Sequence, residues 1–181
     1  LLFYSFSLEE ILNFEIPCVK AFKESGIKMF HTMWQKGLNS PLTSSVGRLF
    51  DAVASFADIL HIQSYEGETG LQIEENYDKT ITQSYSYEII DDKIEISSMV
   101  KQIILEKDKK LICLKFINTL VSIVLDISNF YKDLPIVLGG GVFQNRTFLE
   151  LLINKFKEQN REFYYNKNIP LNDGGISVGQ I

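Results

Sequence analysis

The sequence has few of the residues from which disulfides and histidine metal sites are built. Its 181 residues include two cysteines and two histidines. Cys18 and Cys113 lie far apart without a CxxC pair, which excludes a disulfide framework and a zinc site and is typical of a reducing cytoplasm. We expect both thiols to be buried as small hydrophobic groups. His31 and His61 form neither HxxxH nor HExxH, so this chain alone cannot build a complete histidine metal site.

The sequence also lacks an excess of basic residues, a signal peptide and an uninterrupted apolar run. It carries 18 Lys and Arg against 23 Asp and Glu, a net charge of −5, and its basic residues are scattered. This charge pattern excludes a broad nucleic-acid surface. The first twelve residues have two glutamates and no basic segment. The most apolar stretch, 111–127, contains Lys115 and Asp126 and falls short of the ~20 apolar residues of a membrane helix. We expect neither nucleic acid nor a membrane as a partner.

What is present is enough for one domain or for one half of a larger one. The apolar share of 45% supports a packed core. The chain begins with Leu rather than Met, so we expect a fragment of a longer protein. Residues 1–37 have only helical patterns and predict a peripheral helical segment, and residues 38–181 predict the main unit.

Residues 134–146, LPIVLGGGVFQNR, are the most informative stretch. A short apolar run at 136–138 is typical of a buried parallel strand, three glycines follow, and then a helical pattern begins. A strand, a glycine turn and a helix bring backbone N–H groups and a helix N-terminus to a phosphate. The order is neither GxGxxG nor a P-loop. A bare GGG favours a tight turn without a ligand, but Asn145, just inside the helix, favours a ligand.

Periodicity and capping residues predict the other elements. Two successive helix–strand units predict adjacent parallel strands with right-handed crossovers, so the glycine turn and the loop at Asp173 should share one edge of a sheet. The most apolar helix should be central and packed on that sheet. The predicted helices are 7–12, 17–26, 27–36, 46–60, 68–75, 97–106, 111–130 and one that includes Asn145 and ends near 157. The predicted strands are 80–90 paired with 93–96, 136–138 and 161–166. We expect Ser97 or Ser98 to cap the helix that ends near residue 106.

Asp51 is the candidate binding residue that the helix pattern isolates. It lies off the apolar stripe of the predicted helix 46–60. Physical chemistry alone favours a solvated acid in this helix, stabilised by the helix dipole. The alternative is a carboxylate that accepts hydrogen bonds from ribose hydroxyls.

Four motifs in order resemble the C-terminal part of the HypF carbamoyltransferase family: NSPLTSSVGRLFDAVASF, SYEGE, VLGGGVFQNR and NDGGISVGQ. They span 39–180, and more distantly they are similar to the threonylcarbamoyl transferases (TsaD/Kae1). The resemblance implies an α/β fold of the actin-like, sugar-kinase-like ATPase class (ASKHA, RNase H-like), of which this chain is the C-terminal half.

The resemblance also implies roles for single residues. Asp51 matches the acid at the ribose and Asp173 the acid that completes a divalent metal site. The matches for the nucleotide-lining positions are Glu66, Gly67, Gly139, Gly140 and Asn145. The HxxxH pair and the first phosphate loop of the family are absent here, and Ile117 stands where many relatives have His.

The implied activity is carbamoyl transfer from a carbamoyl-adenylate to the C-terminal cysteine of a HypE-like acceptor, which leads to the cyanide ligand of NiFe hydrogenases. ATP and carbamoyl phosphate would reach the site through upstream domains. No catalytic residue is assigned, because an activated adenylate needs only orientation and charge stabilisation. The alternatives are threonylcarbamoyl transfer to tRNA and a non-catalytic nucleotide-binding half-domain. We expect this chain alone to be inactive.

Overall fold

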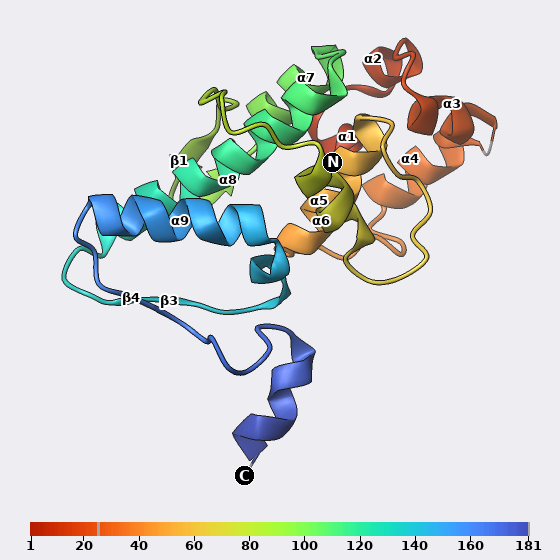
Figure 1. Cartoon of the computed structure of the whole chain (residues 1–181). Helices are drawn as coiled ribbons and strands as arrows, with labels where there is room; N and C mark the ends of the chain where they lie inside the picture. The colour runs from red at the N-terminus through yellow and green to blue at the C-terminus, as the bar shows by residue number, and fades with distance from the viewer. Residues whose placement is uncertain (25, 181) are drawn as a thin grey trace.

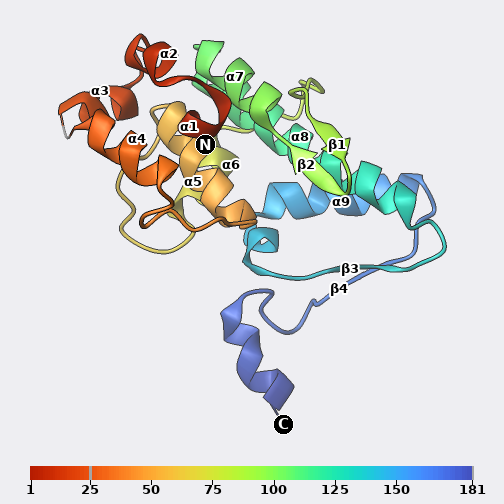
Figure 2. The same ribbon diagram turned by 180° about the vertical axis from the view of Figure 1, so that it is seen from behind.

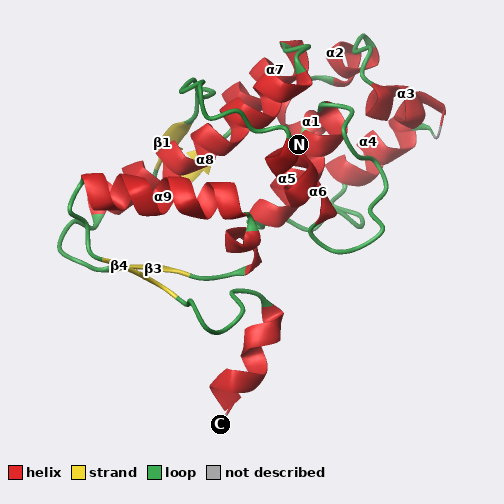
Figure 3. Cartoon of the chain, viewed as in Figure 1, coloured by secondary structure: helices red, strands yellow, loops and turns green. Residues whose placement is uncertain are grey.

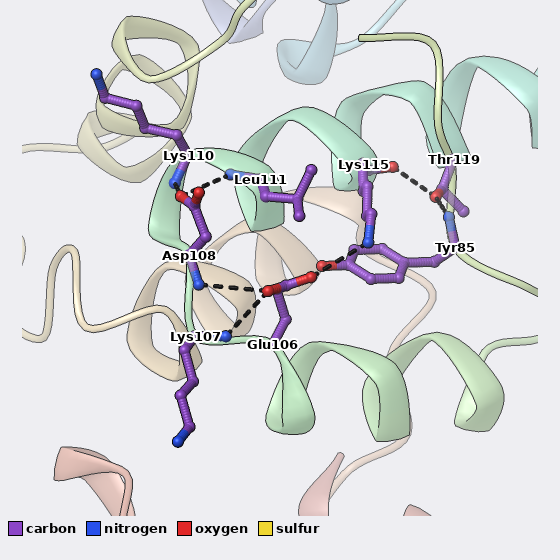
Figure 4. Close-up of polar contacts among 8 residues, drawn as sticks. All are labelled: Tyr85, Glu106, Lys107, Asp108, Lys110, Leu111, Lys115 and Thr119. Carbon is purple, nitrogen blue, oxygen red and sulfur yellow. Dashed lines mark hydrogen bonds and ion pairs between the residues drawn. The ribbon is translucent and has the colours of Figure 1, made fainter.

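A long apolar helix, α8 (Lys109–Phe130), lies at the centre of the structure. The computed structural model describes residues 1–24 and 26–180. Asp108 begins α8 by accepting the N–H groups of Lys110 and Leu111, which places its start two residues before the predicted one (Figure 4). By length and composition α8 could cross a membrane, contrary to the sequence-based expectation. However, 56% of its most apolar window is buried inside the molecule, as in the core helix of a soluble protein.

The neighbours of α8 are mainly helices rather than the predicted sheet. It packs against α9 (Arg146–Glu158), α5 (Val46–Phe56) and α6 (Glu68–Glu75). Figures 1 and 2 show α9 between α8 and the pair of strands β3 and β4. The largest fully buried side chains of this shared core are Phe116, Phe156, Ile73, Met99, Ile103, Ile117 and Leu152. Cys113 is also buried there, which raises its pKa to about 12, and Cys18 is half-buried.

The predicted hairpin is present but its first strand is much shorter. β1 (Glu88–Ile90) pairs antiparallel with β2 (Lys93–Glu95). Residues 80–87 instead run along α8, where Asn118 Nδ2 donates to backbone carbonyls of this segment and Thr119 accepts the N–H of Tyr85 at 2.8 Å. These side chains of α8 satisfy backbone groups that a partner strand would otherwise pair.

The second sheet confirms the predicted parallel pair. β3 (Ile136–Leu138) pairs with β4 (Phe163–Tyr165), with Ile136 opposite Phe163. α9 makes the crossover between them, and β4 is shorter than the predicted 161–166. The chain ends in the 3₁₀ helix η2 (Asp173–Gln180), which lies away from the helices in both views (Figures 1 and 2).

Short helices precede α5, as predicted, and have their own small core. They are α1 (Leu2–Ser5), α2 (Leu8–Leu12), α3 (Pro17–Glu24) and α4 (Ile27–Gln35), drawn in red in Figure 3. Ser7 and Glu10 form a capping box at α2. The small core consists of Leu2, Ile11, Val19 and Ile27, against which Phe56 also packs. The boundary at residue 37 stays a prediction.

The expected serine cap of α7 (Ser97–Leu105) is wrong. Its N-cap residue is Ile96, without a side-chain cap. The N–H and the hydroxyl of Ser97 both donate to Glu95 Oε1, at 2.8 and 2.6 Å. Glu95, rather than a serine side chain, therefore pairs an N–H group at the start of α7.

Candidate functional site

A cavity of about 620 Å³ lies where α5, the start of α6, the glycine turn and the loop before η2 meet. These segments are far apart in the sequence. Five of the predicted site residues line this cavity: Asp51, Glu66, Gly67, Asn145 and Asp173. The volume is that of a small-molecule site.

Asp51 is held by side chains from two other segments. Thr69 Oγ1 donates to Asp51 Oδ1 at 2.7 Å, and Gln63 Nε2 donates to the same oxygen. Arg48 Nε lies 3.1 Å from Asp51 Oδ2, and the Asp51 side chain is 23% exposed. The favoured prediction of a solvated helix acid is therefore wrong, because residues 12 and 18 positions later fold back onto the carboxylate.

The turn before α6 depends on glycine and on a short hydrogen-bond network. Gly67 is the N-cap residue of α6 with φ 86°, a left-handed conformation that side chains rarely adopt. Ser64 donates its N–H at 2.6 Å and its hydroxyl at 2.9 Å to Glu68 Oε2, which lowers the pKa of Glu68. Glu66 is exposed beside this turn. Glu66 and Gly67 of this turn line the cavity together with Asp51.

Asn145 joins α9 to α6. It is the N-cap residue of α9, one position before the predicted place inside the helix, and its Oδ1 accepts the N–H of Phe148 at 2.8 Å. Its Nδ2 donates to the carbonyl of Gly70 at 3.0 Å. Glu74 Oε1 accepts the N–H of Thr147 at 2.6 Å. Two of the first N–H groups of α9 are therefore already paired and are not free for a phosphate.

The glycine turn carries the Asp173 loop. Gly140 has φ 105°, and its N–H donates to the carbonyl of Leu171 at 3.0 Å. This bond confirms that the turn and the Asp173 loop lie at one edge of the β3–β4 pair. Gly141, in the 3₁₀ helix η1 (Gly141–Gln144), lines the cavity, whereas Gly139 lines a second, larger cavity of about 1170 Å³.

Asp173 is exposed, and its neighbour makes the turn. Asn172 Oδ1 accepts the N–H of Gly174 at 3.1 Å, so the side chain of Asn172 rather than that of Asp173 pairs this backbone group. Among the described residues, no three His, Cys, Asp or Glu side chains lie close enough to hold a metal ion. The described residues alone therefore do not form a metal site.

Sequence analysis missed Thr69, Gln63 and Arg48 as neighbours of Asp51. Thr69 directly follows the SYEGE motif, so its position beside the motif could have indicated that it lies near the site. Arg48 precedes Asp51 by three positions, which is one helical turn. Gln63 lies in an irregular loop, and nothing in its local sequence indicates the contact.

The chain matches one protein family over nearly its whole length. Residues 2–180 match the family model described as "Carbamoyltransferase, Kae1-like Domain, second subdomain". The match includes residues 2–37, for which the motifs gave no resemblance.

Individual relatives agree with this match. The chain is 31% identical over 161 residues to the carbamoyltransferase HypF of Synechocystis sp. The aligned region covers 85% of this chain and 21% of that relative. It is 28% identical over 181 residues to the probable carbamoyltransferase HypF of Methanocaldococcus jannaschii, with coverages of 95% and 24%. The chain thus spans less than a quarter of the length of these two relatives.

Solved structures show the same relationship. The fold is similar to full-length HypF in a phosphate- and nucleotide-bound form, with a TM-score of 0.77, 31% identity, and coverages of 89% of this chain and 23% of that one. It is also similar to HypF of T. kodakarensis, with a TM-score of 0.70 and 20% identity, which supports the fold. The chain therefore belongs to the HypF carbamoyltransferase family and corresponds to the second subdomain of its Kae1-like domain.

Proposed function

We propose that this chain is part of a carbamoyltransferase that moves a carbamoyl group from carbamoyl-adenylate to the C-terminal cysteine of a HypE-like protein. The resulting thiocarboxamide would be the precursor of the cyanide ligand of NiFe hydrogenases. The observation that carries the proposal is the cavity of about 620 Å³, which gathers five motif residues from four distant segments. A related structure is described as phosphate- and nucleotide-bound, which supports a nucleotide as the ligand.

The chemistry requires little from this chain beyond binding. The acceptor thiolate attacks the carbamoyl carbon, a C–S bond forms, and the bond from that carbon to the phosphate oxygen breaks. AMP leaves with the electron pair, so no nucleophile from the protein is needed. Asp51 would accept a hydrogen bond from a ribose hydroxyl. The backbone at Gly67 and the turn at 139–141 would lie along the nucleotide. ATP and carbamoyl phosphate would be supplied through domains outside this chain, in the cytoplasm.

We assign the finer fold to the actin-like, sugar-kinase-like ATPase class, with residues 38–181 as its C-terminal half. The β3–β4 pair supports this assignment, because two strands alone are marginal as a sheet. Val137 is 74% exposed and Tyr164 is 55% exposed on this pair. Neither strand has a further partner in the described part of the chain. In a larger sheet, strands outside these residues would pair the free edges, and elements packed on its face would cover both side chains.

We assign Asp173 as one ligand of a divalent metal whose other ligands lie outside this chain. A carboxylate suits a hard cation, and histidines would complete a mixed N/O site. Asp173→Asn in the full protein should lose bound metal while keeping its fold, whereas Asp92→Asn, a matched change at an exposed turn, should keep it. Stoichiometric metal in purified Asp173→Asn protein, measured by elemental analysis, would remove Asp173 from the site.

The function is tested by a transfer assay with the full protein. Carbamoyl phosphate, ATP and a peptide ending in Cys should give a carbamoylated peptide, detected by mass spectrometry, and a peptide ending in Ser should give none. Modification of tRNA instead of the peptide would favour a threonylcarbamoyl transferase. Nucleotide binding without any transfer would favour a non-catalytic nucleotide-binding domain.

A further inference from the structure

The two oxygens of the Asp51 carboxylate have different surroundings. Oδ1 accepts hydrogen bonds from Thr69 Oγ1, at 2.7 Å, and from Gln63 Nε2. A carboxylate oxygen has about two acceptor positions. Both positions of Oδ1 are therefore used by the protein, and a ligand finds no free acceptor there.

Oδ2 is buried and has no hydrogen-bond partner among the described residues. Arg48 Nε is 3.1 Å away, but this ion pair lacks hydrogen-bond geometry. The Arg48 side chain is 63% exposed, so its guanidinium is solvated and can move aside at small cost. An unpaired carboxylate oxygen at the wall of a cavity is a ready acceptor for a ligand hydroxyl.

We propose that Thr69 and Gln63 are positioning residues that saturate Oδ1 of Asp51, so that Oδ2 alone is presented to a sugar hydroxyl of the bound nucleotide. The inference rests on the proposed nucleotide site and goes beyond it, because it assigns the orientation of the carboxylate and two residues that set it. Arg48 covers Oδ2 in the free protein and is displaced when the hydroxyl binds.

The position of Thr69 is well determined. It is 3% exposed, in the first turn of α6 and two residues after the left-handed Gly67. The next residue, Gly70, accepts a hydrogen bond from Asn145. The hydroxyl that orients Asp51 is thus part of the first turn of α6. The hydrogen bond from Asn145 to Gly70 connects this turn to the start of α9.

The experiment measures nucleotide affinity by calorimetry in the full protein, with AMP, 2′-deoxy-AMP and 3′-deoxy-AMP as probes. Thr69→Val keeps the shape of the side chain and removes the donor, and Thr69→Ser keeps the donor. We expect Thr69→Val to weaken AMP binding about tenfold, the loss typical of one misplaced charge-assisted hydrogen bond. The deoxy nucleotide that lacks the recognised hydroxyl should lose far less affinity, and Thr69→Ser should bind all three probes like the wild type.

An equal loss for all three nucleotides would overturn the inference, because it would indicate a general structural effect of the substitution. Unchanged AMP affinity in Thr69→Val would overturn it as well. Wild-type protein that binds none of the three probes would overturn the proposed nucleotide site and this inference together. Wild-type binding with an unaffected Thr69→Val variant overturns the inference alone. If Thr69→Val does not fold, Gln63→Leu, at a loop position, gives the same comparison for the second donor.

Discussion

At the scale of single residues, the hydrogen bonds of Asp51 decide which substitution tests its role best. Asp51→Ala would leave the buried Thr69 hydroxyl without its acceptor, which mixes a stability loss with a binding loss. Asp51→Asn can keep an oxygen opposite Thr69 and replaces Oδ2 by an N–H₂ group. We predict that Asp51→Asn weakens nucleotide binding by about 1.5–3 kcal/mol and changes the free energy of unfolding much less. Calorimetry and urea denaturation of the full protein measure the two quantities, and a nucleotide affinity equal to wild type would return Asp51 to a structural role.

Tyr85 gives a second prediction, which concerns stability alone. Its ring is buried between α7 and α8, Lys115 Nζ lies 5.3 Å from the ring centroid, and its hydroxyl has no hydrogen-bond partner in the described part of the chain (Figure 4). Removing an unpaired buried hydroxyl is neutral or favourable. Tyr85→Phe should therefore leave the free energy of unfolding unchanged or raise it by up to about 1 kcal/mol.

The matched control is Tyr87→Phe on the same segment. The Tyr87 hydroxyl donates to Asp126 Oδ2 at 2.5 Å. Burial, and after it this hydrogen bond, raise the pKa of Tyr87. Its removal should lower the free energy of unfolding. Urea denaturation that ranks Tyr85→Phe below Tyr87→Phe in stability would contradict this account of the segment.

At the scale of elements, the sequence predicted what local periodicity determines. The helices from α5 to α9 are present, although α5 ends at Phe56, four residues before the predicted end. The parallel β3–β4 pair and its shared edge with the Asp173 loop agree with the prediction. The failed strand prediction at residues 80–87 is a place where a distant segment supplies the hydrogen bonds. Residues 80–87 alternate like a strand, yet Asn118 and Thr119 of α8 pair their backbone groups.

The N-terminus of α9 provides the prediction at this scale. Asn145 both caps α9 and donates to Gly70, so Asn145→Ala loses the cap and the tie to α6. We predict a loss of about 1–2 kcal/mol in the free energy of unfolding. Asn145→Asp retains the cap and loses only the tie, so it should lose less stability and should still weaken nucleotide binding. Equal stability of the Ala variant and the wild type in urea denaturation would contradict the role of Asn145.

At the scale of the whole molecule, two apolar surfaces of the chain are uncovered. A cavity of about 1170 Å³ with a mainly apolar lining opens among α1, α5, the hairpin and α8, and the β3–β4 pair exposes Val137 and Tyr164. The chain spans 21% and 24% of two relatives. We predict that the 181-residue chain alone has no carbamoyltransferase activity, because it lacks the family's histidine pair and first phosphate loop. Carbamoylation of the Cys peptide by the purified chain, measured by mass spectrometry, would contradict this prediction.

The site itself was predictable only as a set of motif positions. The fold brings five of the motif residues, Asp51, Glu66, Gly67, Asn145 and Asp173, to one cavity, whereas Gly139 and Gly140 do not line it. Sequence could not predict how Asp51 is oriented, because Gln63 lies in an irregular loop and the position of Thr69 beside SYEGE does not indicate which oxygen of Asp51 it contacts. It also could not predict that Glu74 would pair an N–H group at the start of α9.

The most direct measurement is a crystal structure of the full protein with a bound adenosine nucleotide. We predict that the ribose lies at Asp51 Oδ2 and that the nucleotide passes between Gly67 and the turn at 139–141. Thr69 and Gln63 should remain on Oδ1, and Arg48 should have moved away from Oδ2. A nucleotide bound elsewhere, with this cavity filled by another part of the chain, would contradict the central claim.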